Sequence, residues 1–293
     1  MENNKKRKRR FGDRSDGRLL RSLNPMQKLM PYIMPQRSDA CNSFRGDIEM
    51  AAIDKYVQEK KQQGKVNFTT MHVLLAAYTR LVSQRPGLNR YISGQKIYHR
   101  NHFEVMLCVK KEMKLNSPDS VISMEYPLDA TADQIYEITE KLVADAKNET
   151  TNFDNLAKIL DYIPGLVKAF AIGLLRFLDY FGLLPKWLMR LSPFHGSLFI
   201  TSMASLGLPP IYHHIYNFGN VPVFLAFGVP EWKSQARPSG DTNAKKMLNY
   251  TLVMDERICD GYYYASAFRL LNVLLRNPWQ LDTPPAEVVE DVD

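Results

Sequence analysis

Residues 247–275 change within a short distance from the periodicity of a strand to that of a helix. Leu248, Tyr250, Leu252 and Met254 occupy alternate positions, which predicts a strand with one buried face. Apolar side chains then recur at helical spacing, at positions 267, 270, 271, 274 and 275. A charged turn, residues 256–261, joins the two. Such a connection is most often structural, but it also suits a functional side chain held at a domain edge.

Similar patterns divide most of the remaining chain into helices and strands. Helical spacing is found over 47–63 with Gly64 as C-cap, from Thr69 to before Pro86, and from Thr131, where Gln134 completes a capping box. Alternation predicts a strand over 103–109, and further strands are expected over 120–124, 198–202 and 221–229. Ser93-Gly94 indicates a hairpin over 91–98. We therefore predict an α+β fold in which a mixed β-sheet packs against helices.

The segment 153–195 departs from this pattern because it is very apolar. Between Leu166 and Leu184 its only charged residues are Lys168, Arg176 and Asp179. On a helix these three lie opposite an apolar face, which consists of Leu166, Phe170, Leu174, Phe177 and Phe181. The charges argue against a helix that crosses a membrane. Three interpretations remain: packing in the core or in an oligomer, lying on a membrane surface, or covering an acyl site.

Length and composition support one large domain with appendages. A chain of 293 residues that is 45% hydrophobic can bury a sizeable core. We place the domain at 41–280, with 153–195 as an apolar helical insertion, and expect tails at 1–40 and 281–293, the second of them acidic. Three irregularly spaced cysteines predict neither a disulfide framework nor a metal site, which favours reduced thiols in a cytoplasmic protein. No signal peptide is expected, because no apolar stretch follows the basic N-terminus.

The positive charge is concentrated at the N-terminus. Residues 1–30 hold ten Lys or Arg and three Asp or Glu, which accounts for the whole net charge of +7. We expect residues 1–21 to be a disordered, solvated tail or to bind an anionic membrane surface or nucleic acid. Nucleic acid is the least favoured partner, because the rest of the chain is neutral and has no nucleic-acid-binding motif. Together with the apolar insertion, the tail would supply the two weak anchors typical of peripheral membrane binding.

The charged turn also carries a family resemblance. It reads Asp255-Glu256-Arg257-Ile258-Cys259-Asp260-Gly261. This string resembles the H-x-x-x-D-G motif of chloramphenicol acetyltransferase and of the dihydrolipoyl acyltransferase cores of 2-oxoacid dehydrogenase complexes. In that family an Asp usually precedes the His and an Arg follows it. Every position matches except the catalytic histidine, which is Glu256 here. The resemblance covers roughly residues 41–150 and 196–277 and implies a chloramphenicol acetyltransferase-like sandwich.

A second stretch resembles the same family more weakly. Leu206-Gly207 matches a Leu-Gly pair of the family. The family's oxyanion-stabilising serine stands two residues before that Leu, and the residue at this place is Ala204 here. Ser205 and Ser202 are close neighbours that a shift of register would bring into use. The adjacent His213 and His214 are candidates for a replacement base, although such a pair is more often structural.

The resemblance implies a definite chemistry. The family's histidine acts as general base on the acceptor, and the serine donates to the oxyanion of a tetrahedral intermediate. A carboxylate with a reference pKa of about 4.3 is a weaker base than imidazole at about 6.5, unless burial raises the pKa of Glu256. In the family the aspartate at Asp260 holds the loop through an arginine, for which Arg18, Arg21 and Arg37 are candidates here.

Two functions therefore remain open. The first is transfer of an acyl group from acyl-CoA or a carrier thioester to a hydroxyl, amine or thiol, with Glu256 in the catalytic place. The second is a non-catalytic binding or assembly platform, at a membrane through the tail and the insertion. Since the family assembles as trimers with active sites between subunits, a homotrimer is implied. No lipoyl domain is found in this sequence, so we expect free acyl-CoA or a carrier protein as the acyl donor, and no metal cofactor.

Overall fold

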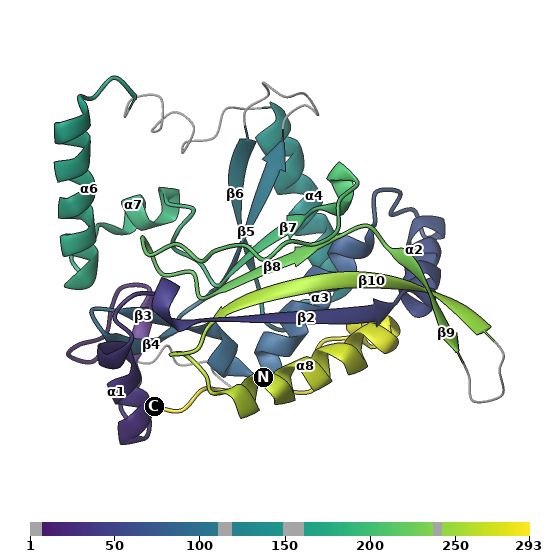
Figure 1. The fold of residues 1–293 in the computed structure, drawn as a ribbon, viewed down its shortest axis with the longest axis horizontal. Helices are drawn as coiled ribbons and strands as arrows, with labels where there is room; N and C mark the ends of the chain where they lie inside the picture. Colours follow the sequence, from purple (N-terminus) through teal and green to yellow (C-terminus); the bar gives the residue numbers. More distant parts are fainter. Residues whose placement is uncertain (1–7, 111–118, 149–160, 237–241) are drawn as a thin grey trace.

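The computed structural model describes residues 8–110, 119–148, 161–236 and 242–293, and its centre is a mixed β-sheet (Figure 1). In these residues the sheet has seven strands, in the order β2-β10-β8-β7-β5-β6, with β9 added beside β10. β7 runs parallel to both β5 and β8, and the other pairings are antiparallel. The strands are β2 Cys41–Glu49, β5 Phe103–Lys110, β6 Asp119–Tyr126, β7 Leu198–Ser202, β8 Val223–Phe227, β9 Glu231–Ala236 and β10 Thr242–Asp255.

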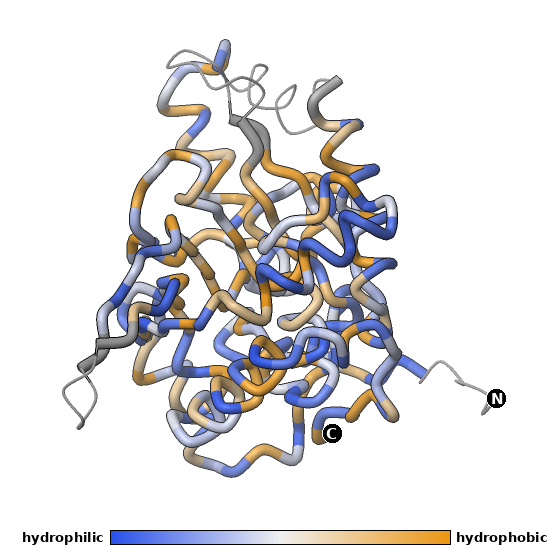
Figure 2. The backbone as a smooth tube through the Cα atoms, turned by 90° about the vertical axis from the view of Figure 1, so that its right-hand side faces the viewer, coloured by the Kyte–Doolittle hydropathy of each residue, from blue (hydrophilic) through white to orange (hydrophobic). Residues whose placement is uncertain are grey.

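Helices cover one face of the sheet and form the main core with it. They are α2 Ala51–Gln62, α3 Thr70–Gln84, α4 Ala132–Asn148 and α8 Gly261–Arg276. The inward side chains Leu248, Leu252 and Met254 of β10 are buried in this core, as the alternation predicted. Figure 2 shows the hydrophobic stretches gathered in the middle of the molecule. Each large apolar side chain buried there contributes about 1.5–3 kcal/mol. The predicted α+β fold is therefore confirmed.

One helix boundary differs from the prediction. Helical spacing predicted a helix over 47–63, but residues 41–49 form β2, in which Ile48 lies opposite Leu248 of β10. Pairing along the whole strand outweighs the local helical pattern at 47–49. The other end is as predicted, because Gly64 adopts a positive φ of 96° after α2.

The residues before β2 are more ordered than their composition indicates. β1, Gly17–Leu19, pairs with β4, Lys96–Arg100, which pairs with β3, Arg90–Ser93, in a second, three-stranded sheet. A Cβ at Gly17 would lie 2.6 Å from the hydroxyl of Tyr91, so only glycine fits there. The expectation of a disordered tail over 1–21 is therefore wrong for residues 8–21, which are tied down by pairing and ion pairs. Residues 1–7 lie outside the described part.

The acidic C-terminal segment is also attached to the domain. The buried carboxylate of Asp291 accepts hydrogen bonds from the Arg90 guanidinium at 2.7 and 2.5 Å and lies 3.2 Å from His99 Nδ1. The backbone carbonyl of Asp293 accepts from the amides of Arg21 and Ser22. Both ends of the described chain are thus joined at one side of the small sheet, beside α1, Pro25–Ile33 (Figure 1).

The apolar insertion projects from the edge of the molecule. Its described part contains α6, Gly165–Tyr180, and α7, Lys186–Leu191, whereas 153–160 lie outside the described residues. α6 buries none of its residues and forms one edge of the molecule (Figure 1). Its side chains Leu166 and Phe170 are 88% and 72% exposed. Within the described residues, no helix combines the length and the apolar character needed to cross a membrane.

Candidate active site

The turn between β10 and α8 is fixed by the fully buried carboxylate of Asp255. Arg257 donates to both of its oxygens, from Nε at 2.8 Å and from Nη2 at 2.7 Å. The Arg257 amide adds a third hydrogen bond at 3.1 Å, and Nε of Arg37 lies 3.8 Å away. Arg257 also donates to the carbonyls of Met34 and Pro35. A buried charge is stable only when it is paired and bonded in this way.

Asp260 has a different role from the one that the resemblance implies. It is exposed, and its Oδ1 accepts from the backbone amide of Tyr263 at 2.8 Å, so it caps the N-terminus of α8. The three candidate arginines lie elsewhere: Arg37 faces Asp255, Arg21 pairs with Asp13 at 3.1 Å, and Arg18 lies 3.8 Å from Asp293. The expected ion pair of Asp260 is therefore wrong for the described residues, because each of the three candidate arginines faces another aspartate.

Glu256, in the catalytic place of the motif, follows directly on this buried pair. Its backbone amide donates to the carbonyl of Ala40 at 2.8 Å, which fixes its Cα. Its side chain is exposed and makes no hydrogen bond or ion pair with the described residues. The backbone at position 256 is thus fixed, and the carboxylate is left unengaged by the described residues.

The residues near the predicted oxyanion place lie in a short 3₁₀ turn, Ala204–Leu206, after β7. Ala204 packs against the main core and has no donor to offer. The exposed Ser205 donates its hydroxyl proton to the carbonyl of Ser202 at 2.8 Å. In this arrangement Ser205 does not present a free proton to a ligand.

The sheet places Glu256 and Ser205 at opposite ends. Along β8, Val223 lies opposite Met254 at the end of β10, whereas Phe227 lies opposite Ser202 at the end of β7. These two levels are separated by four residues, or roughly 13 Å, and both candidate residues lie beyond them. One chain therefore does not bring Glu256 and Ser205 together.

His213 lies at the same end of the sheet as Glu256. The loop 207–222 crosses the sheet face opposite the helices, where His213 stacks on Phe224 with ring centroids 4.2 Å apart. Phe224 is the β8 partner of Val253, three residues before Glu256. Nε2 of His213 is buried without a hydrogen-bond partner among the described residues. Burial, together with the adjacent His214, lowers the pKa of His213, so its ring is neutral at pH 7.

His214 is exposed and packs edge-on against Tyr216, with ring centroids 4.9 Å apart. The structure thus separates the adjacent histidines, one ring against the sheet and the other in solvent. No cluster of His, Cys, Asp or Glu among residues 8–110, 119–148, 161–236 and 242–293 is arranged to hold a metal ion.

A buried ion network that the sequence did not reveal attaches the insertion to the domain. Arg14 donates to Asp179 of α6 at 2.7 Å and to Asp16 at 3.2 Å. Nε2 of His195 lies 3.5 Å from the other oxygen of Asp179. Burial opposes ionisation of Asp179, but His195 and Arg14 outweigh it and lower the pKa of Asp179 to about 2. The one signal in the sequence was that Asp179 is the only acidic residue of a very apolar helix.

Comparison with known proteins identifies the fold. No protein-family model matches the sequence, and no curated protein is detectably similar to it. Solved structures do match. The probable dihydrolipoamide acetyltransferase of Listeria monocytogenes is 13% identical, with 92% of this chain and 97% of that one covered and a TM-score of 0.57.

Two further structures agree with this match. The cubic core of the pyruvate dehydrogenase multienzyme complex is 14% identical over 89% of this chain and 93% of that one, with a TM-score of 0.51. Chloramphenicol acetyltransferase is 13% identical over 88% and 99%, with a TM-score of 0.52. The chain therefore has the chloramphenicol acetyltransferase-like fold shared with dihydrolipoamide acetyltransferases, as the motif predicted. At this level of identity the match establishes the fold alone.

Replacing Asp255 tests which aspartate holds the turn. We expect Asp255→Asn to lower the free energy of unfolding by about 3–5 kcal/mol, because two buried arginines lose their counter-charge. Asp260→Ala should cost only about 1 kcal/mol, the usual loss of a helix cap. Urea denaturation of both variants measures the difference. A larger loss for Asp260→Ala would show that the turn depends on the cap instead.

The decrease in the free energy of unfolding at acid pH should depend on Asp179. Its pKa is lowered in the folded state, so its contribution is complete above the unfolded value near 4 and is lost as the pH falls towards 2. We expect Asp179→Asn to lower the free energy of unfolding at pH 7 by about 2–3 kcal/mol and to flatten its fall between pH 4 and 2. Asp129→Asn, at an exposed carboxylate, is the control. An unchanged acid slope in Asp179→Asn would contradict the assignment.

Proposed function

We propose that the protein is an acyltransferase that moves an acyl group from acyl-CoA or a carrier thioester to a hydroxyl, amine or thiol acceptor, with Glu256 in the catalytic place. One observation carries this proposal. The motif turn keeps its buried ion pair and its helix cap, and presents at the catalytic place an exposed carboxylate that is not engaged by the described residues. A scaffold so maintained around an available base supports proton transfer at that point.

The chemistry requires a proton acceptor and a stabilised oxyanion. Glu256 accepts the proton of the acceptor's hydroxyl, amine or thiol while the oxygen, nitrogen or sulfur of that acceptor attacks the thioester carbonyl. The tetrahedral intermediate then expels the thiolate, which takes this proton from Glu256 and leaves as the free thiol. His213, neutral at pH 7 and at the same end of the sheet, is the alternative base. Because Ala204 cannot donate, the reaction lacks an oxyanion contact worth about 10²–10³-fold in rate. Ser205 would have to release the carbonyl of Ser202 to replace it.

An assembly of several copies, a homotrimer by the family resemblance, is part of this proposal. The opposite positions of Glu256 and Ser205 in one chain support a site made by two copies, each contributing one end of its sheet. A similar structure is itself the core of a multienzyme complex. We infer a cytoplasmic protein, in keeping with three cysteines at no regular spacing, with acyl-CoA as co-substrate.

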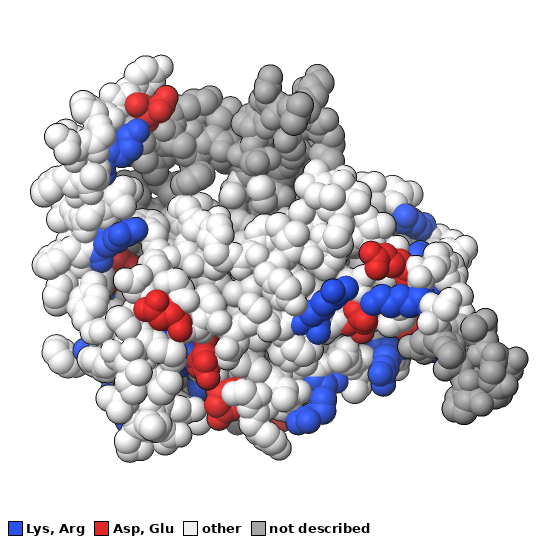
Figure 3. Space-filling view, in the orientation of Figure 1, with Lys and Arg blue, Asp and Glu red and all other residues white. Residues whose placement is uncertain are grey.

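The second candidate is a non-catalytic platform at a membrane surface, and α6 favours it. Among the described residues its apolar face has no cover, while Asp179 on the other face is attached to the domain. In Figure 3 much of the edge that α6 forms is uncharged surface. α1 and α6 lie on either side of the tip of the β3–β4 hairpin. α1 also has exposed apolar side chains, which are Met26, Tyr32 and Ile33. Two exposed apolar helices on one side suit an interfacial contact.

Release of free thiol from a panel of acyl-CoAs with candidate acceptors tests the acyltransferase proposal. We expect turnover by the wild type, a fall of about 10²-fold or more in Glu256→Ala and in Glu256→Gln, and little change in Glu287→Ala, which removes an exposed carboxylate elsewhere. If His213→Ala alone abolishes turnover, His213 is the base. An absence of thiol release by the wild type with every thioester would leave the platform as the function.

Flotation with anionic vesicles tests the membrane platform. We expect Phe170→Asp to reduce vesicle binding at least tenfold, because a charge on the apolar face of α6 opposes burial in the interface. Trp232→Asp is a matched control, since Trp232 of β9 is 71% exposed and Phe170 is 72% exposed. Equal binding by both variants would show that α6 does not contact the membrane.

A further inference from the structure

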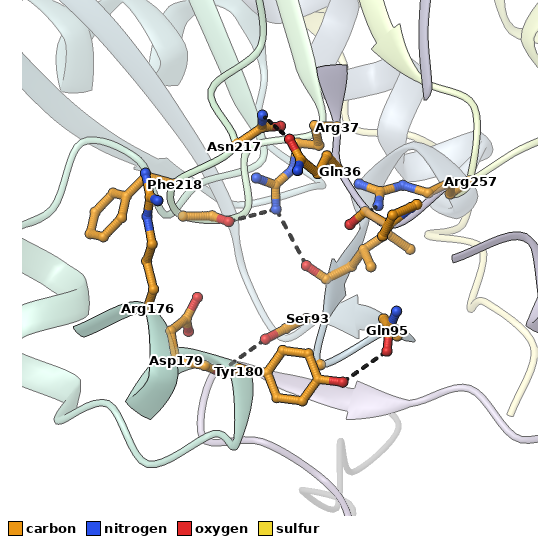
Figure 4. A pocket seen from close by; sticks show the side chains of 14 residues that line it. Gln36, Arg37, Ser93, Gln95, Arg176, Asp179, Tyr180, Asn217, Phe218 and Arg257 are labelled. Carbon is orange, nitrogen blue, oxygen red and sulfur yellow. Dashed lines mark hydrogen bonds between the residues drawn. The ribbon is translucent and has the colours of Figure 1, made fainter. Parts of the chain in front are cut away.

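A pocket of about 200 Å³ lies beneath α6, between the insertion and the domain (Figure 4). Its walls come from the second half of α6, the segment 35–37, the tip of the β3–β4 hairpin and the loop 217–219. Three arginines line it: Arg37, Arg176 and Arg257. In Figure 4, Arg37 lies between Arg176 on the α6 side and Arg257 on the other.

The two inner arginines share one carboxylate. Arg37 and Arg257 are only 5% and 3% exposed. Arg257 donates hydrogen bonds to both carboxylate oxygens of Asp255. Nε of Arg37 lies 3.8 Å from the same carboxylate and makes no hydrogen bond with the described residues. The remaining donors of Arg37 go to the carbonyls of Tyr216, Gly219 and Ile92, which carry no net charge. The two buried guanidinium groups therefore share a single carboxylate, and the pair lacks one counter-charge.

The acidic residue of the pocket does not supply that charge. Asp179 lines the pocket, but one of its oxygens accepts from Arg14 at 2.7 Å and the other faces His195. Arg14 also pairs with Asp16, which lies 3.7 Å from Arg100. The two aspartates are thus matched by two arginines within their own network, and the attraction of Asp179 for Arg37 is opposed by the repulsion of Arg100.

The outer side of the pocket adds further positive charge and neutral donors. Arg176 is exposed on α6 and makes no ion pair with the described residues. Gln36 and Gln95 use their amide oxygens to accept from Asn217 at 3.0 Å and from the Tyr180 hydroxyl at 2.8 Å. Their NH₂ groups have no acceptor among the described residues. The free groups around the pocket are therefore donors and cations.

The electrostatics of Arg37 agree with a missing anion. Burial lowers its pKa to about 10, and the attraction of Asp255 and Asp179 is opposed by repulsion from Arg257 and Arg100. A guanidinium so deep in the protein is stable when an anion approaches it. The pocket is too small for a large ligand, but it accommodates a phosphate group with its several acceptor oxygens.

We propose that this pocket binds a phosphate group, which Arg176 and the donors of Gln36 and Gln95 contact directly and which the buried Arg37 and Arg257 attract. A dianionic phosphate matches the excess of positive charge at Arg37 and Arg176 and accepts several hydrogen bonds at once. The phosphate belongs either to a soluble compound or to the headgroup of a lipid, since the pocket lies at the base of the apolar helix α6.

Titration with inorganic phosphate at constant ionic strength tests the site without a membrane. We expect saturable binding by the wild type, seen by calorimetry and as a rise in Tm with phosphate concentration. Arg176→Glu should weaken the affinity at least tenfold. Lys168→Glu, the same charge change two turns earlier on α6 and outside the pocket, should change it less than twofold.

Vesicles of phosphatidylcholine with and without phosphatidic acid distinguish the two sources. If phosphatidic acid increases binding of the wild type and of Lys168→Glu but not of Arg176→Glu, the phosphate is that of a lipid. If soluble phosphate saturates the pocket in an Arg176-dependent way and phosphatidic acid adds nothing, the phosphate is that of a soluble compound. The proposal is overturned if the wild type responds to neither probe, or if Arg176→Glu and Lys168→Glu behave alike. Thiol release from acyl-CoA, measured on the same variants, reports separately on Glu256.

Discussion

The buried carboxylate of Asp255 is the interaction on which the functional end of the molecule depends. It ends the long strand β10 and binds Arg257, which in turn holds the segment at Met34 and Pro35. Arg37 approaches the same carboxylate and donates to the loop carbonyls of Tyr216 and Gly219. Three segments far apart in the sequence are therefore fixed around one negative charge. Without it two guanidinium groups would be buried unpaired, which is far more costly than any exposed contact in this region.

This arrangement separates the geometry of the turn from its chemistry. Asp255 and Arg257 fix the backbone and Asp260 caps α8, whereas the side chain at position 256 makes no hydrogen bond or ion pair with the described residues. The shape of the turn therefore does not depend on which side chain stands at position 256. The same reasoning applies at the other end of the sheet, where Ala204 packs into the core and Gly207 ends the turn with a positive φ. At both places the backbone conformation is fixed independently of the groups proposed for the chemistry.

The insertion reverses the usual orientation of an amphipathic helix. Asp179 of α6 points towards the domain, where it pairs with Arg14 and lies close to His195. The apolar face of α6 is left exposed. Buried ion pairs are satisfied only with close geometry, so this attachment is specific. It also brings Arg176 to a pocket in which the charge of Arg37 is already under-compensated. A helix that looked like a simple hydrophobic element is thus attached through Asp179, and its Arg176 and Asp179 line the pocket proposed to bind phosphate.

Periodicity along the chain was enough to predict most helices and strands, because burying one face of each element is a local property of the sequence. The alternation at Leu248, Leu252 and Met254 and the motif at Asp260-Gly261 predicted the strand–turn–helix and the fold. Charge pairing could not be predicted in the same way. Three features depend on contacts between residues far apart in the chain. They are the choice of Asp255 over Asp260 as the partner of the arginines, the burial of Arg14, and the ends of the sheet at which Glu256 and Ser205 lie. Only the tertiary structure decides these, because ion pairs depend on distance in space and on the exclusion of water.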